Sequence, residues 1–169
     1  MKKSFWSLIG ILLIAPLVAI FGYRCYKDIV FTQNCGGYLK RAADANSVDL
    51  AKGELRKSLA YIEANNLTSG YTSILYNTPD EDVGFWYTNL STSLKDLETM
   101  SPTASDLEKS NMLLKLRQSL LDHGDSGEHV TIPHGVSVFP HNAALAIGGI
   151  LSLFTALIGT VMLLVVFNE

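Results

Sequence analysis

Apolar residues are concentrated at the two ends of the chain, and the middle is polar. The first apolar run extends from Phe5 to Tyr23 and the second from Ala143 to Phe167. Each run is long enough to cross a hydrocarbon layer of about 30 Å as a single helix. The pattern therefore predicts two transmembrane helices that flank one extramembrane domain.

These boundaries divide the chain into three parts. Residues 1–23 are predicted to form a transmembrane signal anchor, residues 24–142 one extramembrane helical domain, and residues 143–169 a C-terminal transmembrane helix. The first run follows two lysines, as in a signal peptide, but bulky residues replace the small pair that a cleavage site needs before Arg24. We therefore expect the anchor to stay uncleaved.

The polar part carries four more acidic than basic residues between Arg24 and Asn142. A nucleic-acid partner needs a basic surface, so we expect none, and the bilayer is the first partner that the sequence predicts. Positive residues flank the first apolar run on both sides, which makes the positive-inside rule a weak guide here. We expect an integral protein of a bacterial inner membrane, with both termini cytoplasmic and the domain periplasmic.

Helical periodicity is clear in the first half of the domain. The first apolar helix is expected to continue to about Ala45, with a kink or a close helix contact at Gly36 and Gly37. Ser47 is a suitable N-cap for the second helix, which ends near Asn66. Its apolar positions recur at three- and four-residue steps and form one stripe: Val48, Ala51, Leu55, Leu59 and Ile62.

Two further helices follow a long loop that extends from Leu67 to Pro79. The third is expected to open at Pro79 with a run of acids, and its stripe consists of Val83, Trp86 or Tyr87, Leu90, Leu94 and Leu97. The fourth begins with a capping box of Ser105 and Glu108. It is expected to end near Asp122, with Leu107, Leu114, Leu120 and Leu121 among its apolar positions.

The remaining polar stretch changes character after Gly124. Apolar and polar residues alternate there, interrupted by Pro133, Gly135 and Pro140. This composition predicts extended chain with one short strand or none. The predicted fold is therefore an all-α membrane protein with two transmembrane helices, an extramembrane bundle of three or four helices, and a short extended segment before the second span.

Chemically active side chains form no recognisable site pattern. The four histidines all lie in the final polar stretch, and their spacing fits no metal-binding signature, so we interpret them as solvated loop residues: His123, His129, His134 and His141. The acids Asp80 to Asp82 are interpreted as helix-start residues, and Trp86 as a core anchor in preference to a stacking platform for a ligand. We expect no catalytic residues, no metal, no cofactor and no enzymatic activity.

The strongest pattern is a row of small residues in the second span. It recurs at four-residue steps and consists of Ala144, Gly148, Ser152, Ala156 and Thr160, widened by Thr155 and Gly159. Such rows let helix backbones approach closely in lipid. Two interpretations stay open: the row binds another chain, or it packs on the small face that Ala15, Ala19 and Gly22 form in the first span.

One stretch of the domain is similar to a known group of sequences. The residues Asn65 to Ser73 (NNLTSGYTS) and Thr78 to Tyr87 (TPDEDVGFWY) resemble a family of uncharacterised bacterial two-span membrane proteins. The resemblance extends over both spans and most of the domain. It implies the layout of span, helical domain and span, and it implies no activity and no site.

Two functions fit this layout. The first is a non-enzymatic scaffold or accessory subunit, which uses the second span and the domain to join other membrane chains or a second copy of itself. The alternative is a truncated extracytoplasmic sensor, which binds a small ligand in the bundle and signals through a partner. A sensor requires a pocket between helices with convergent polar groups, whereas a scaffold requires an exposed apolar patch.

Overall fold

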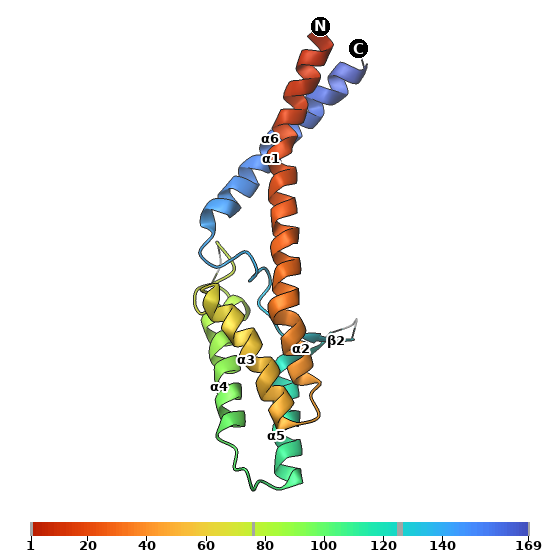
Figure 1. Ribbon diagram of the computed structural model, residues 1–169. Coiled ribbons are helices and arrows are strands. Elements are labelled where there is room, and N and C mark those ends of the chain that lie inside the picture. The colour runs from red at the N-terminus through yellow and green to blue at the C-terminus, as the bar shows by residue number, and fades with distance from the viewer. Residues whose placement is uncertain (1, 76, 125–126, 169) are drawn as a thin grey trace. The chain divides into compact units, whose positions relative to one another are not determined.

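The computed structural model describes residues 2–75, 77–124 and 127–168, and it is mostly helical (Figure 1). The chain forms two compact units. One consists of the chain up to Lys27 together with the chain from His141 onward, and the other extends from Asp28 to Pro140. The two units are described separately below.

The first unit contains the two long apolar helices that the sequence predicts, and they pack against each other. They are α1 (Lys2–Phe31) and α6 (Ala143–Asn168), and both are long and apolar enough to cross a membrane. Most of their large side chains are exposed, including Leu12 at 70% and Phe154 at 64%. Two helices expose this much apolar surface only if another apolar medium or another protein covers it.

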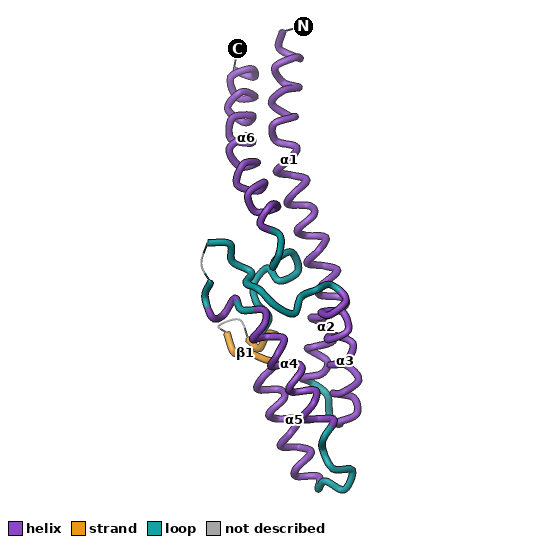
Figure 2. The backbone as a smooth tube through the Cα atoms, turned by 90° about the vertical axis from the view of Figure 1, so that its left-hand side faces the viewer, coloured by secondary structure: helices purple, strands orange, loops and turns teal. Residues whose placement is uncertain are grey.

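The second unit is a four-helix bundle in which successive helices run in opposite directions (Figures 1 and 2). Its first helix continues α1 through a π-helical turn, η1 (Thr32–Gly36), into α2 (Gly37–Ala43). The others are α3 (Val48–Ala64), α4 (Val83–Glu98) and α5 (Asp106–Leu120). The predicted helical bundle between the two apolar helices is therefore confirmed.

The core of the bundle follows the predicted stripes of the second and third helices. In α3 the buried apolar residues are Ala51, Leu55, Leu59 and Ile62, and in α4 they are Val83, Trp86, Leu90 and Leu97. The Ser47 side chain accepts a hydrogen bond from the Leu50 amide at 3.3 Å, as expected of an N-cap. Asn66 adopts φ 57° just after α3, a left-handed conformation that asparagine tolerates well.

At Gly36 and Gly37, where the sequence predicts a kink or a close helix contact, the helical run passes through the π-helical turn η1. A π-turn widens the helix locally and leaves one backbone carbonyl outside the regular pattern. The carbonyl of Cys35 accepts a hydrogen bond of 3.1 Å from the buried Ser58 hydroxyl of α3. The turn is thus stabilised by the neighbouring helix, and Cys35 is fully buried there.

The third helix begins later than the acidic run predicts. Residues Pro79–Glu81 form a short 3₁₀ turn, η2, and the α-helix starts only at Val83. The reason is Asp82, whose extended backbone and side-chain oxygen make it the N-cap. Its Oδ1 accepts a hydrogen bond of 3.0 Å from the amide of Phe85.

The fourth helix confirms the capping box but ends at Leu120 rather than near Asp122. Its last residue leads directly into a two-stranded antiparallel hairpin of β1 (Leu121–Gly124) and β2 (Gly127–Val130), which the sequence analysis did not predict. The amide of Thr131 donates to the carbonyl of Leu120 at 2.9 Å and closes the hairpin against the helix end. Both Leu120 and Leu121 are buried by this change of direction.

The inward face of α5 also differs from the apolar positions named from sequence. Leu107 and Leu114 are exposed at 71% and 54%, whereas Leu116 and Leu120 are buried. Leu116 and Leu120 are one turn apart and share a face, and Leu107 lies on the opposite side of the helix. Periodicity was ambiguous here because leucine occurs on both sides of the helix.

Candidate functional site

The small residues of α6 are divided between the helix contact and the exposed surface. Ser152 and Ala156 are buried and Gly148 is partly buried, while Ala144 and Thr160 are exposed. A four-residue step advances by about 400° around a helix, so each step rotates the row by about 40°. Five positions at this spacing therefore cannot all face one straight neighbouring helix.

The closest contact between the two apolar helices is formed by two glycines. A Cβ atom added to Gly159 would lie 2.6 Å from the carbonyl oxygen of Gly10, and one added to Gly10 would lie 2.8 Å from Leu163 Cγ. Neither position has room for a side chain. Gly159 was named only as widening the row, and Gly10 was not singled out, because no periodic pattern surrounds it.

The face that the sequence analysis assigned to α1 is not the one that packs on α6. Ala15 and Ala19 are exposed, and a Cβ on Gly22 would meet nothing within 4 Å. These residues lie roughly 140° around the helix from Gly10. The close approach at Gly10 decides the contact, and larger side chains such as Leu13 and Ile14 fill the space beside it.

The hydroxyl groups of α6 bond within their own helix. Ser152 donates to the carbonyl of Gly149 at 2.8 Å, Thr155 to Ser152 at 3.1 Å, and Thr160 to Ala156 at 2.8 Å. A polar group in an apolar medium needs such a partner. These bonds satisfy the hydroxyls without any second helix.

The histidines are spread over the surface of the described chain. The His129, His134 and His141 side chains are exposed, and the His123 side chain lies outside the described part. Among the described residues, no three histidine, cysteine or acidic side chains are close enough to hold a metal ion. The acidic run is used locally, because Asp82 caps α4 and the Glu81 carboxylate accepts from the Thr78 hydroxyl at 2.7 Å.

The aromatic residues at the start of α4 have different surroundings. Trp86 is buried in the core, as predicted, and its indole nitrogen donates to the carbonyl of Thr131 at 3.0 Å. The hydroxyl of Tyr87 donates to Glu63 at 2.8 Å, and this hydrogen bond raises the pKa of Tyr87. Phe85 is exposed at 64%. Trp86 therefore joins α4 to the chain after the hairpin and is not a platform for a ligand.

Four ion pairs join the helices of the bundle, one at each neighbouring interface. Arg41 pairs with Glu54 between α2 and α3, and Arg56 with Glu98 between α3 and α4. Lys115 pairs with Asp96 at 2.9 Å between α5 and α4. Arg117 closes the ring by pairing with Asp44, just after α2, at 3.3 Å.

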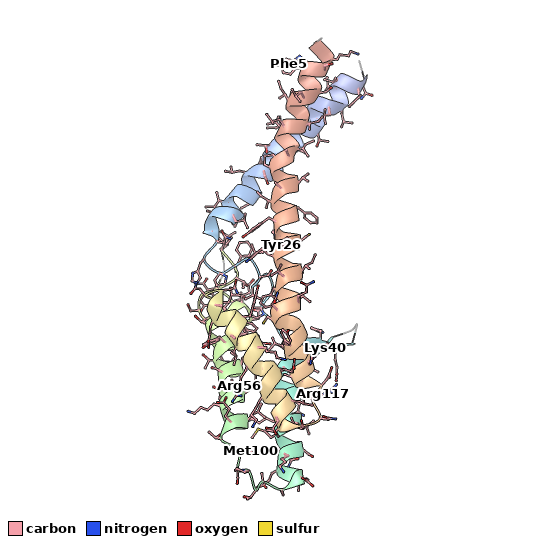
Figure 3. All side chains as sticks on the ribbon, viewed as in Figure 1. Phe5, Tyr26, Lys40, Arg56, Met100 and Arg117 are labelled. Atoms are coloured by element: carbon pink, nitrogen blue, oxygen red, sulfur yellow. The ribbon has the colours of Figure 1, made fainter. Side chains whose placement is uncertain are left out.

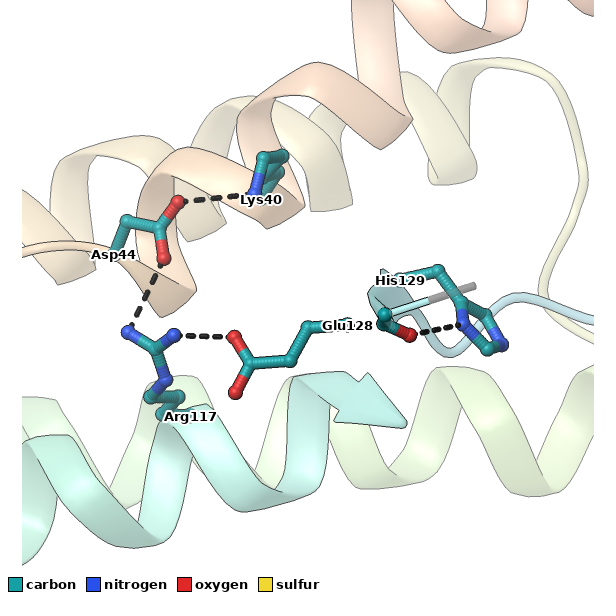
Figure 4. Close-up of polar contacts among 6 residues, drawn as sticks. Lys40, Asp44, Arg117, Glu128 and His129 are labelled. Atoms are coloured by element: carbon teal, nitrogen blue, oxygen red, sulfur yellow. Dashed lines mark hydrogen bonds and ion pairs between the residues drawn. The ribbon is translucent and has the colours of Figure 1, made fainter. Parts of the chain in front are cut away.

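The Arg117 pair belongs to a larger network (Figure 4). Asp44 also accepts from Lys40 at 3.2 Å, and the second guanidinium nitrogen of Arg117 donates to Glu128 of β2. One side chain thus connects α5, the end of α2 and the hairpin. The network is partly exposed, so its contribution to stability is modest, of order 1 kcal/mol or less for each pair.

The backbones of α4 and α5 approach each other closely over a shorter length than those of the other neighbouring helix pairs. A groove of about 240 Å³ lies between these helices, with Leu97, Met112 and Leu116 as its apolar residues. It joins a more open hollow of about 810 Å³ at the α4–α5 connection, where Figure 3 labels Met100. Both spaces are lined by Asp96, Met112 and Lys115.

Polar groups converge on this groove. Its polar lining residues are Asn89, Thr92, Ser93, Asp96, Lys115 and Ser119. Within the described residues, the side chains of Asn89, Thr92 and Ser93 form no hydrogen bond to another residue, and Lys115 and Asp96 carry opposite charges across the groove. The groove is open to water, because Asn89 and Thr92 are exposed and the Lys115 side chain is 68% exposed.

A second hollow of about 400 Å³ lies beside Glu54, between the end of α2 and the start of α3. The Glu54 side chain is only 8% exposed, and one of its oxygens accepts from both Arg41 at 3.1 Å and Lys57 at 2.9 Å. Its other oxygen has no partner among the described residues. Two cations already neutralise this carboxylate, so it serves as a buried link between helices.

No protein-family profile, curated protein or solved structure matches this chain. The resemblance of Asn65 to Tyr87 to a bacterial two-span family stays a prediction.

Proposed function

We propose that the chain is a two-span membrane protein whose bundle binds a small zwitterionic molecule, such as an amino acid, between α4 and α5. The observation that carries this proposal is the groove itself, in which the apolar residues Leu97 and Leu116 lie beside the Asp96–Lys115 pair. This is the sensor interpretation of the sequence. It moves ahead of the scaffold interpretation because the small residues of α6 have an alternative use within the chain.

The membrane part of the proposal rests on the surfaces of α1 and α6. Between Phe5 and Tyr23 in α1, every exposed residue is apolar, and in α6 the large exposed side chains from Ile147 to Phe167 are apolar, as lipid contact requires. Aromatic residues bracket the apolar run of α1, with Trp6 near one end and Tyr23 and Tyr26 near the other. Trp6 and Tyr23 are separated by roughly 26 Å along the helix axis, which suits aromatic residues at the two interfaces. We propose cytoplasmic termini and a periplasmic bundle.

The charge pair in the groove indicates the class of ligand. Asp96 would bind the ammonium group of a zwitterion and Lys115 its carboxylate, so the ligand replaces each partner with an equivalent one. Asn89, Thr92 and Ser93 would supply hydrogen bonds at the side of the groove. A purely anionic or cationic ligand would leave one of the two charged residues without a counter-charge, which costs affinity.

Binding would act on the rest of the molecule through α5. This helix packs on α2, and Arg117 pairs with Asp44, the residue that follows α2. In turn, α2 is the last part of the helical run that begins with α1. A ligand that draws α4 and α5 together would therefore shift α5 against α2. A membrane partner would detect the resulting movement of α2.

The proposal is tested by thermal melts of the full chain in lipid nanodiscs with a panel of free amino acids and betaine. We expect at least one zwitterion to raise the melting temperature in a saturable manner, because a ligand that binds only the folded state stabilises it. Asp96→Asn and Lys115→Gln should each abolish the shift.

Lys109→Gln is the matched control. Lys109 is on the same helix and pairs with Asp106 at 3.8 Å, away from the groove, so the shift should persist in this variant. If no zwitterion stabilises the parent protein beyond the effect of an equal concentration of sodium chloride, the ligand-binding proposal is wrong.

The scaffold function keeps one specific observation in its favour. Leu107 and Leu114 are exposed two turns apart on α5, and Ala144 and Thr160 are exposed on α6. A partner chain would cover these residues. Crosslinking mass spectrometry on native membranes tests this function, since Leu107→Ser with Leu114→Ser should remove crosslinks to another chain without unfolding the bundle.

A further inference from the structure

The loop between α3 and α4, together with the first turn of α4, exposes four large apolar side chains. We define the loop patch as Tyr71, Ile74, Leu75 and Phe85, whose exposed fractions are 37%, 47%, 80% and 64%. No charged residue occurs in the sequence between Glu63 and Asp80. The nearest charges are the acids Asp80 to Asp82, which border the patch where Tyr71 pairs with Asp82 and the Phe85 amide donates to the Asp82 carboxylate. Large exposed apolar side chains grouped in one uncharged stretch of sequence are a feature of interaction surfaces.

The base of the loop is fixed to the start of α4 by backbone hydrogen bonds. The amide of Thr72 donates to the carbonyl of Glu81 at 3.1 Å, and the amide of Val83 donates to Gly70 at 2.9 Å. Leu67 is buried in the core at the beginning of the loop. These bonds fix the part of the loop that carries Tyr71 against the start of α4, which carries Phe85.

The loop patch lies at the end of the bundle from which the chain leaves toward both apolar helices. Tyr61, in the last turns of α3, packs against Phe31 with ring centroids 5.9 Å apart. Trp86 at the start of α4 bonds to Thr131, which leads toward Pro140. Both views of the backbone place the loop and the 131–140 segment at this same end of the bundle (Figures 1 and 2).

We propose that the loop patch inserts into the headgroup region of the bilayer, an inference that rests on the proposed membrane insertion of α1 and α6. Phe31 follows the end of the first apolar run at Tyr23 by roughly 12 Å of helix, so this end of the bundle is tethered close to the lipid surface. Tyr71 beside aliphatic Ile74 and Leu75 has the amphipathic character that interfacial segments favour. Lipid is the favoured occupant because two covalent connections lead from this end to the apolar helices.

The test uses the full chain in lipid nanodiscs, with Cys25→Ser as background and the buried Cys35 retained. A single cysteine replaces Leu75, Leu12 or Leu107 and carries an environment-sensitive fluorophore. Leu12, in α1, reports membrane insertion, and Leu107, an equally exposed leucine at the far end of the bundle, is the matched control. The quencher is a lipid with a nitroxide on its headgroup or upper acyl chain.

We expect lipid nitroxides to quench the fluorophore at residues 12 and 75 and to leave the one at residue 107 unchanged. Quenching at residue 12 without quenching at residue 75 overturns the loop proposal and leaves membrane insertion intact. Absence of quenching at all three residues overturns the membrane proposal itself. If residue 75 is shielded from lipid but responds when the protein is diluted to one copy per nanodisc, a second copy covers the patch and the loop proposal is again wrong.

Discussion

The contact between α1 and α6 and the core of the bundle are built from opposite kinds of residues. The first depends on the absence of side chains at Gly10 and Gly159, while large apolar side chains face outward. The second buries large side chains such as Trp86 and Leu55. In water, burial of large apolar groups drives association, whereas in lipid that drive disappears and close backbone packing must replace it. The difference is the one expected if the two contacts form in different solvents.

The largest effect is expected from Trp86→Ala, which tests the water-driven half of the comparison. The substitution removes a buried ring and its hydrogen bond to Thr131, so the free energy of unfolding should fall by about 3–5 kcal/mol. Thermal and urea melts of the full chain in nanodiscs measure it. Phe85→Ala is the matched control, because Phe85 is the adjacent aromatic residue and is exposed, and its effect should stay within about 0.5 kcal/mol.

The contact between α1 and α6 is tested by Gly159→Leu. The new side chain would meet the backbone of Gly10, so the helices must separate, at a cost of about 1–3 kcal/mol. Gly149→Leu is the matched control, since a Cβ there meets nothing within 4 Å. Resistance of the α1–α6 pair to unfolding by SDS measures the effect. Equal behaviour of the two variants would show that the glycine contact is not needed.

The sequence predicted the helices better than their contacts. Ser47, Ser105 and Glu108 act locally, so their capping roles follow from neighbours in the chain. Gly10 contacts a helix that lies more than a hundred positions away in the sequence. No pattern in the residues around Gly10 indicates this contact. The sequence analysis named a pocket between helices only as something that a sensor would require. It could not locate the groove between α4 and α5, because periodicity within each helix does not determine how the two helices are rotated relative to each other.

A smaller effect on stability is expected from a substitution at the exposed start of α5. Neither the core of the bundle nor the α1–α6 contact extends to this point. The backbone amide of Ser105 and its hydroxyl both donate to Glu108, and these bonds lower the pKa of that carboxyl. Ser105→Ala should cost about 1 kcal/mol at neutral pH. Because the folded pKa is below the ordinary value of 4.5, the stabilisation is present above that pH and is lost as the pH falls. Only the bond from the Ser105 hydroxyl to the carboxylate titrates in this comparison, because the variant keeps the Ser105 amide and the parent keeps the bond from the Glu108 amide to the Ser105 hydroxyl. Melts between neutral and acidic pH should therefore show a difference between parent and variant that shrinks on acidification without vanishing.

The smallest effect concerns thiol reactivity, in which the two cysteines of the long helical run are expected to differ. Burial raises the pKa of the Cys35 thiol from 9.0 to about 12, so the reactive thiolate is scarce at neutral pH, whereas Cys25 is exposed. In the Cys25→Ser variant, a maleimide should label the protein only after denaturation. Rapid labelling of the folded variant would mean that η1 opens readily and that the bundle core does not extend to this turn.

The central claim is that α1 and α6 cross the bilayer and place the bundle on the side opposite to the chain termini. Reporter fusions after Glu169 and within the 67–78 loop test it directly in living cells. The account predicts that the two reporters are active in opposite compartments, with the terminal one cytoplasmic. Activity of both reporters in the same compartment, or a mature chain that starts near Arg24, would contradict it.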